Sequence, residues 1–182
     1  MRTVAGNALL SIGAAATILA GQGQLDRSYN FSGCRWGGSA IAYRDETGSY
    51  FMATRAAAGR WNVSSRAVHI HAMPEATWTI TAIDLGPTGQ YGLTTWNCMA
   101  GRFTSVVTYY NRYYTDGFTF EQRVSLMTHE MGHALGLAHT AITVGCPVSI
   151  MVANFSQTWG RCQEAWPQRY DIEAVRALYL SP

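Results

Sequence analysis

Three histidines and one glutamate lie close together in a single stretch of the chain, which reads HEMGHALGLAH from His129 to His139. His129 and His133 are four residues apart, so on an α-helix their side chains would lie one turn apart on the same face. Both imidazoles could then reach one zinc ion at Zn–N distances of about 2.0–2.1 Å. The spacing therefore predicts a helix that carries two ligands of a metal site.

A straight helix could not bring His139 to the same ion. Its ten-residue offset from His129 corresponds to about 15 Å along the helix axis, at 1.5 Å per residue. Gly136 lies where the chain must turn back, and glycine takes positive φ without steric cost and commonly ends helices. We expect His139 to approach the metal from a loop.

Three neutral histidines leave a fourth zinc position open for water, which distinguishes a catalytic zinc site from a closed structural one. Glu130 would point about 100° around the helix from His129, so we expect it to miss coordination and to meet the water as general base. Water attack on a peptide carbonyl would give an oxyanion that zinc stabilises. The alternative is that the histidines are merely solvated or packed and bind no metal. A short HExxH pattern alone could arise in this way by chance, but the whole segment from His129 to His139 is far more specific.

The pattern HEMGHALGLAH resembles the zinc signature of the metzincin metallopeptidases, and the surrounding chain resembles a small secreted bacterial matrixin-type member. The resemblance implies one catalytic Zn²⁺ held by His129, His133 and His139, with Glu130 as the catalytic residue. No prediction follows for structural Ca²⁺.

A second likeness is the Met-turn of these enzymes. Met151 ends the segment CPVSIM, twelve residues after His139, and by resemblance would form an apolar floor under the histidines. The alternative is an ordinary core methionine. The proline that matrixins place shortly after this methionine is missing, and we expect residues 152–166 to form one wall of the specificity pocket.

The segment 170–179 is similar to the C-terminal helix of matrixins. Tyr170 replaces the first of two aspartates in that pattern, while Asp171 is kept. Two departures narrow the subfamily: Ala153 stands where astacins and serralysins carry a tyrosine, and Thr140 follows the third histidine where adamalysins usually have aspartate.

Length and composition fit one secreted domain. We expect a signal peptide over residues 1–20, a short linker over 21–33 and the catalytic domain over 34–182. Met1-Arg2 precedes the uncharged run Ala8–Ala20, which is shorter than the about 20 residues that span a bilayer, so a membrane anchor is the weaker alternative.

The charge balance gives no sign of a nucleic-acid partner. The chain has 13 basic and 11 acidic residues, a formal net charge of +2 and no basic block. The expected partner is an extended peptide or protein substrate, and the expected state is a secreted monomer.

Four cysteines allow three pairings. We favour Cys34 with Cys98 and Cys146 with Cys162, because the second pair would close a loop that contains the Met-turn. The competing hypothesis is a cysteine switch, in which Cys34 would block the zinc. Its surroundings, Phe31–Trp36, do not resemble the propeptide motif of the family.

The remaining patterns predict alternating elements. Strands are predicted over 39–44, 66–72, 76–83, 92–97 and 105–110, and an alanine-rich helix over 50–61. Thr119 and Gln122 form a capping-box pattern at the start of the zinc helix. A core-facing row at helical spacing follows: Val124, Met127, Met131, Ala134 and Leu135.

This order predicts a three-layer α+β domain with a twisted mixed sheet. The metzincin resemblance implies five strands and an antiparallel edge strand along the cleft, a position that Leu93–Trp96 matches best. Such an edge binds an extended peptide through main-chain hydrogen bonds. The alternative is a plain sheet edge.

The predicted function is that of a secreted zinc-dependent endopeptidase. The alternatives are a catalytically silent, zinc-stabilised binding module and a zinc hydrolase of a non-peptide amide. His69 and His71 alternate in a predicted strand and could bind a second metal, but no third ligand is apparent.

Overall fold

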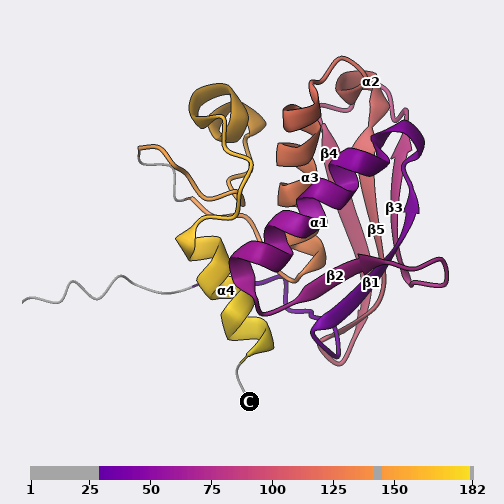
Figure 1. Cartoon of the computed structure of the whole chain (residues 1–182), viewed down its shortest axis with the longest axis vertical. Helices are drawn as coiled ribbons and strands as arrows, with labels where there is room; N and C mark the ends of the chain where they lie inside the picture. Colours follow the sequence, from indigo (N-terminus) through magenta and orange to yellow (C-terminus); the bar gives the residue numbers. More distant parts are fainter. Residues whose placement is uncertain (1–28, 142–144, 181–182) are drawn as a thin grey trace, which may run out of the picture.

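The computed structural model describes residues 29–141 and 145–180 (Figure 1). The predicted signal peptide and most of the predicted linker lie outside the described residues. The elements in chain order are β1 (Ala40–Glu46), a 3₁₀ turn η1 (Gly48–Tyr50), α1 (Phe51–Ser65), β2 (His69–Ala72), β3 (Trp78–Ile83), β4 (Gly92–Met99), β5 (Arg102–Asn111), α2 (Arg112–Thr115), α3 (Phe120–Ala134), a π-helical turn η2 (Ser156–Arg161) and α4 (Arg169–Tyr179).

The strands form one mixed sheet in the order β2-β1-β3-β5-β4. β1 pairs in parallel with β2 and β3, and β3 pairs in parallel with β5. β4 runs antiparallel to β5 and forms an edge of the sheet. The expected five-stranded mixed sheet with an antiparallel edge strand is confirmed.

Two helices cover one face of the sheet, and the C-terminal part of the chain packs beyond them. Figure 1 shows α1 and α3 side by side, with α4 and η2 on the far side from the sheet. The predicted core row of α3 is confirmed, since all of its members are 0% exposed. They pack in one core with side chains of α1 and the sheet, among them Trp61, Trp78 and Ile80.

Several predicted boundaries were wrong: β1 ends at Glu46 rather than at 44, α1 ends at Ser65 rather than at 61, β3 begins at Trp78 rather than at 76, and β4 ends at Met99 rather than at 97. Two further shifts have local backbone reasons. Residues 66–68 are not in a strand, because Arg66 takes a left-handed conformation (φ 52°) that ends α1, and β2 begins only at His69. β5 begins at Arg102 rather than at 105. Ala100 and Gly101 both have positive φ, and this two-residue turn joins β4 directly to β5.

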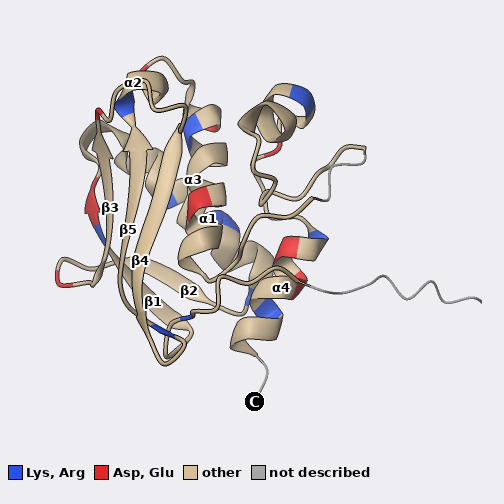
Figure 2. Ribbon diagram, turned by 180° about the vertical axis from the view of Figure 1, so that it is seen from behind, with Lys and Arg blue, Asp and Glu red and all other residues tan. Residues whose placement is uncertain are grey.

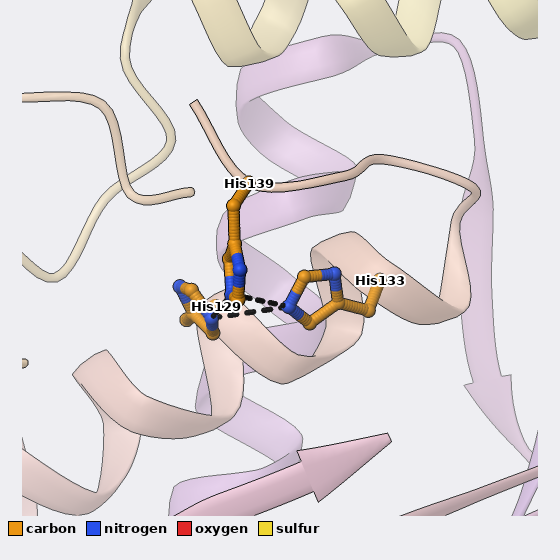
Figure 3. A group of neighbouring side chains, drawn as sticks. All are labelled: His129, His133 and His139. Carbon is orange, nitrogen blue, oxygen red and sulfur yellow. Dashed lines mark hydrogen bonds between the residues drawn. The ribbon is translucent and has the colours of Figure 1, made fainter. Parts of the chain in front are cut away.

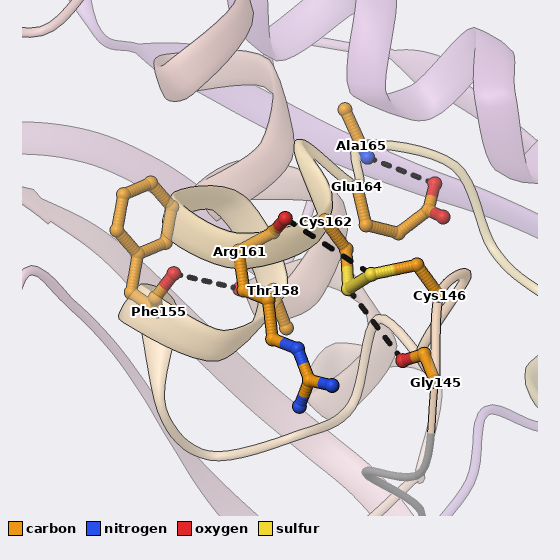
Figure 4. Close-up of a disulfide and its surroundings, with 8 residues drawn as sticks. All are labelled: Gly145, Cys146, Phe155, Thr158, Arg161, Cys162, Glu164 and Ala165. Atoms are coloured by element: carbon orange, nitrogen blue, oxygen red, sulfur yellow. Dashed lines mark hydrogen bonds between the residues drawn. A yellow bond between two sulfur atoms is a disulfide. The ribbon is translucent and has the colours of Figure 1, made fainter.

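Both predicted disulfides are confirmed, Cys34–Cys98 and Cys146–Cys162. The first ties the segment before β1 to β4. The second joins the chain just before the Met-turn to the residue that follows η2 (Figure 4). The two covalent links therefore lie on opposite sides of α3 in the sequence, and each restrains a loop-rich segment.

Charged residues are scattered over the helices, strands and loops rather than gathered on one element (Figure 2). Within residues 29–141 and 145–180, none of the helices has the length and apolar character needed to cross a membrane.

Candidate metal centre and active site

α3 carries the first two histidines, and it begins and ends as its sequence predicts. The Thr119 hydroxyl accepts a hydrogen bond from the Gln122 N–H at 3.3 Å, and the Gln122 side chain accepts one from the Thr119 N–H at 2.8 Å. At the other end the chain turns at Gly136, whose φ is 101°, and the Leu137 N–H donates to the Gly132 carbonyl at 3.0 Å. The predicted bend after the helix is confirmed.

The three histidines converge on one point (Figure 3). The Nε2 atoms of His129 and His133 lie 3.2 Å apart, those of His133 and His139 3.1 Å, and those of His139 and His129 3.3 Å. Nitrogens bound to zinc at about 2.0 Å in a tetrahedron would lie about 3.3 Å apart. The triangle of nitrogen atoms has the size that zinc requires.

The outer nitrogens of two rings are bound to main-chain carbonyls. His129 Nδ1 lies 2.7 Å from the Ile150 oxygen, and His133 Nδ1 lies 2.9 Å from the Leu137 oxygen. A carbonyl can only accept, so Nδ1 carries the proton in both rings and Nε2 presents a lone pair. Those two Nε2 atoms have no proton to share with each other, and a cation between them satisfies both.

Burial keeps these rings neutral. It lowers the pKa of His129 to about 3 and that of His133 to about 4, and it also lowers the pKa of His139. Metal ligation needs neutral imidazole. The electrostatics and the geometry of the cluster therefore agree with a metal centre.

The loop that carries His139 is held from the N-terminal side of the domain. The Asn30 side-chain amide donates to the His139 carbonyl oxygen at 2.8 Å, and the Ala138 N–H donates to the Asn30 carbonyl at 2.8 Å. Phe31 and Leu137 form an antiparallel bridge next to these two contacts. The end of the predicted linker thus contacts the candidate metal site, which the sequence pattern did not predict.

Met151 lies in the core directly behind α3, where it is 2% exposed. A β-carbon at Gly132, between the two helical histidines, would collide with the Met151 sulfur. The same turn is held by Asp171 of α4, which accepts hydrogen bonds from the Ser149 hydroxyl and, at 2.9 Å, from the Ile150 N–H. The methionine therefore lies under the helix segment that carries the histidines.

Glu130 lines the same cleft as the three histidines and contacts the edge strand β4. It is 5% exposed, and its Oε2 accepts a hydrogen bond from the Thr94 hydroxyl of β4 at 2.7 Å. Its Oε1 lies beside Gly92, where a β-carbon would come within 2.6 Å of that oxygen. Burial raises the pKa of the Glu130 carboxyl to about 7, and the Thr94 hydrogen bond opposes the rise.

A cleft of about 840 Å³ runs past this carboxylate and the three histidines. One side is β4, which contributes Leu93, Thr94 and Trp96, and the other is the chain after the Met-turn. Of the predicted wall 152–166, residues 152–156 and Thr158 line the cleft. The end of that segment is held by the helices instead, since Ser125 of α3 donates to the Glu164 carbonyl and Arg60 of α1 donates to the Ala165 carbonyl at 2.6 Å.

The second pair of histidines stays apart from this cleft. His69 and His71 lie on β2, at the opposite edge of the sheet from β4, with ring centroids 5.3 Å apart. Among the described residues no third ligand joins them, because the one group of three or more metal-binding side chains is the His129 cluster.

A profile of the matrixin family matches residues 39–180. Two structures of myroilysin align with TM-scores of 0.55 and 0.54 at 13% and 12% identity, covering 84% and 81% of this chain and 89% and 83% of those chains. High choriolytic enzyme 1, a hatching enzyme zinc-protease from the medaka fish Oryzias latipes, aligns at 16% identity with a TM-score of 0.49, covering 83% of this chain and 96% of that one. A comparison with curated proteins finds no match.

The family match, the fold and the histidine cluster together define a zinc metalloendopeptidase of the metzincin type. This chain belongs to the matrixin family, since the matched region covers most of its length. The family that the zinc signature resembles and the fold class predicted from the order of elements are both confirmed.

Proposed function

We propose that this chain is a secreted zinc endopeptidase in which His129, His133 and His139 hold one Zn²⁺ and Glu130 is the general base. The observation that carries the proposal is the triangle of Nε2 atoms, 3.1–3.3 Å on each side, in the same cleft as a buried carboxylate. A purely structural zinc site would be closed by a fourth protein ligand. Here the cluster holds three histidines and faces a cleft.

A zinc ion bound by these residues would supply Lewis acidity, which polarises a substrate carbonyl and eases deprotonation of a water molecule. Glu130 takes the proton of the attacking water and passes it to the nitrogen of the leaving amine. Its surroundings support this role, because Thr94 fixes one carboxylate oxygen and the absence of a side chain at Gly92 leaves room for the other.

β4 is the element that we assign to substrate binding. It is an edge strand, and four of its residues line the cleft beside the candidate metal centre: Gly92, Leu93, Thr94 and Trp96. An extended peptide can add to such an edge through main-chain hydrogen bonds, which do not depend on a chain terminus. This mode of binding suits cleavage within a polypeptide.

Secretion is supported by the two disulfides, since such bonds form and persist in oxidising compartments. The predicted signal peptide lies outside the described residues, so it remains a prediction. Detection of the chain in the culture medium, with N-terminal sequencing of the secreted form, would test both.

The decisive test compares wild type, E130Q and H139A. We expect wild type to contain one zinc per chain by elemental mass spectrometry and to hydrolyse casein until a chelator is added. E130Q should keep its zinc and its melting temperature but lose at least about 10²-fold in hydrolysis, the usual minimum for removal of a general base. H139A should lose zinc. The control is E75Q, an exposed glutamate in the turn between β2 and β3.

Two outcomes would redirect the assignment. A wild-type chain that binds zinc but cleaves no peptide would favour the silent binding module or a non-peptide amide substrate. Full activity in E130Q would remove Glu130 from the mechanism.

A further inference from the structure

A line of buried polar side chains crosses the sheet and ends on Glu130. It begins at Trp78 on β3, continues through Thr108 on β5 and reaches Thr94 on β4, so it uses three neighbouring strands. Trp78 Nε1 lies 3.0 Å from Thr108 Oγ1. The Oγ1 atoms of Thr108 and Thr94 are 3.3 Å apart, and Thr94 Oγ1 lies 2.7 Å from Glu130 Oε2. Trp78 and Thr108 are 0% exposed and Thr94 is 7% exposed.

The chemistry of the first member sets the direction of the line. The indole Nε1–H of Trp78 can only donate, so Thr108 accepts from it and has its own hydroxyl proton free for Thr94. Thr94 then accepts from Thr108 and donates to Glu130. The Glu130 carbonyl oxygen is a second possible acceptor at 3.1 Å, but the carboxylate oxygen at 2.7 Å is closer and charged. Hydrogen bonds that run in one direction polarise and strengthen one another.

The buried Trp78 N–H requires the Thr108 hydroxyl as its acceptor, but the packing alone does not require the Thr94 hydroxyl. Valine has the shape of threonine and places no polar atom in the core, where an unpaired hydroxyl is costly. Both hydroxyls are nevertheless paired, and the last proton is given to the carboxylate of α3 rather than kept within the sheet. The line is thus built to hold an anionic group at its end.

We propose that Thr94 is a positioning residue for Glu130, with Thr108 and Trp78 orienting its hydroxyl, so that Oε2 is fixed and Oε1 is the oxygen that exchanges the proton. This inference rests on the proposed role of Glu130 as general base. The placement of Oε1 follows from its position beside Gly92, where nothing but a hydrogen atom stands between it and the strand. Thr94 also belongs to the strand that we assign to the substrate, so the same element would place both the base and the peptide.

The test replaces the hydroxyl without changing the shape. T94V should lower kcat by about 10- to 100-fold, because a small misplacement of a catalytic group costs about that much, while KM and zinc content stay near wild type. T94S restores the hydroxyl and should recover most of the rate. The matched control is T104V on β5, whose side chain is exposed and does not line the cleft.

Thr108 is tested in a double-mutant cycle with Thr94. T108V alone should lower kcat about two- to tenfold, in keeping with the loss of one neutral hydrogen bond. In the T94V background it should cause no further loss, because the hydroxyl that it orients is gone.

Three results would overturn the proposal: wild-type kcat in T94V, equally low kcat in T94S and T94V, or fully multiplicative effects of T94V and T108V. A wild-type chain without peptidase activity would contradict the proposed function instead. In that case crystal structures of wild type and T94V still decide the matter, since the proposal requires the Glu130 carboxylate to leave its wild-type position when the hydroxyl is absent.

Discussion

Asp171 and His129 hold the same residue, Ile150, by its two main-chain polar groups. Asp171 Oδ2 accepts a hydrogen bond from the Ile150 N–H at 2.9 Å, and the Ile150 carbonyl accepts one from His129 Nδ1 at 2.7 Å. The C-terminal helix therefore fixes the orientation of the first histidine through one residue of the Met-turn. Hydrogen bonds to the outer nitrogen of a ligating histidine set both its ring orientation and its tautomer.

We predict that D171A destabilises the fold and weakens zinc binding. The side chain is 0% exposed, and its loss would leave the Ser149 hydroxyl and the Ile150 N–H buried without their acceptor. Because each buried donor left without an acceptor costs about 1–3 kcal/mol, we expect a loss of about 2–5 kcal/mol in the free energy of unfolding and about tenfold in zinc affinity. Urea denaturation would measure the free energy of unfolding, and competition with a chromogenic chelator would measure the zinc affinity. E75A is the control for both. Unchanged zinc affinity in D171A would show that the Met-turn keeps its shape without this anchor.

The same carboxyl predicts a pH dependence. Burial raises the pKa of Asp171 to about 6, although the hydrogen bonds that it accepts oppose the rise. Since this is above the ordinary value of 3.8, the folded chain takes up the proton first as the pH falls. The stabilising contribution of Asp171 is thus complete below about pH 4 and is lost as the pH rises through about 6.

The measurement compares D171N with the unsubstituted chain, both in an E130Q background that prevents self-cleavage. Between about pH 4 and 7, the free energy of unfolding of the chain with Asp171 should fall, relative to D171N, by on the order of 3 kcal/mol. A slope of the opposite sign would mean that the hydrogen bonds outweigh burial and hold the pKa below its ordinary value.

G92A should remove activity and keep the metal. A β-carbon at position 92 would lie 2.6 Å from Glu130 Oε1 and 2.9 Å from its carboxyl carbon, so the carboxylate must move. We expect at least about 100-fold lower kcat/KM, measured on a peptide substrate, with zinc content unchanged. G38A serves as the control, because a β-carbon there meets no heavy atom within 4 Å. Near-normal activity in G92A would indicate that Glu130 has another productive position.

N30A should weaken zinc binding without unfolding the domain. The Asn30 side chain is exposed, but its amide donates to the carbonyl of His139. Loss of one neutral hydrogen bond predicts zinc affinity about two- to tenfold lower. Competition with a chelator in the E130Q background measures the zinc affinity independently of catalysis. N97A removes a comparable exposed hydrogen bond to Ser105, away from the metal centre, and should leave zinc affinity unchanged. Equal affinity in N30A and N97A would contradict a role for Asn30.

The candidate site could be predicted from sequence where its residues lie in one segment. The spacing of His129 and His133, the turn at Gly136 and the capping box at Thr119 are all local, so helix geometry alone gives their arrangement. The five-stranded sheet and the edge strand came from the family resemblance. Both disulfide pairs were also expected.

The supporting contacts could not be predicted in this way, because each joins distant parts of the chain. Thr94 and Glu130 are 36 residues apart, and Asn30 and His139 are 109 apart. Neither threonine nor asparagine has a spacing that marks it as a partner of a catalytic group. The early start of β5 did have a local signal, the Ala100-Gly101 pair, since glycine in a two-residue turn is typical of a hairpin.

The Cys34–Cys98 bond joins the segment that holds His139 to the strand that borders the cleft. Asn30 lies only four residues before that cysteine. A chain made where thiols stay reduced would lack this covalent tie, and the loop that carries His139 would be held only by hydrogen bonds and by the packing of Leu137 in the core. If the proposed zinc is bound, its retention would then depend on the compartment in which the chain folds. Recombinant protein from a reducing cytosol should lose zinc to a chelator sooner than protein that has been exported and oxidised.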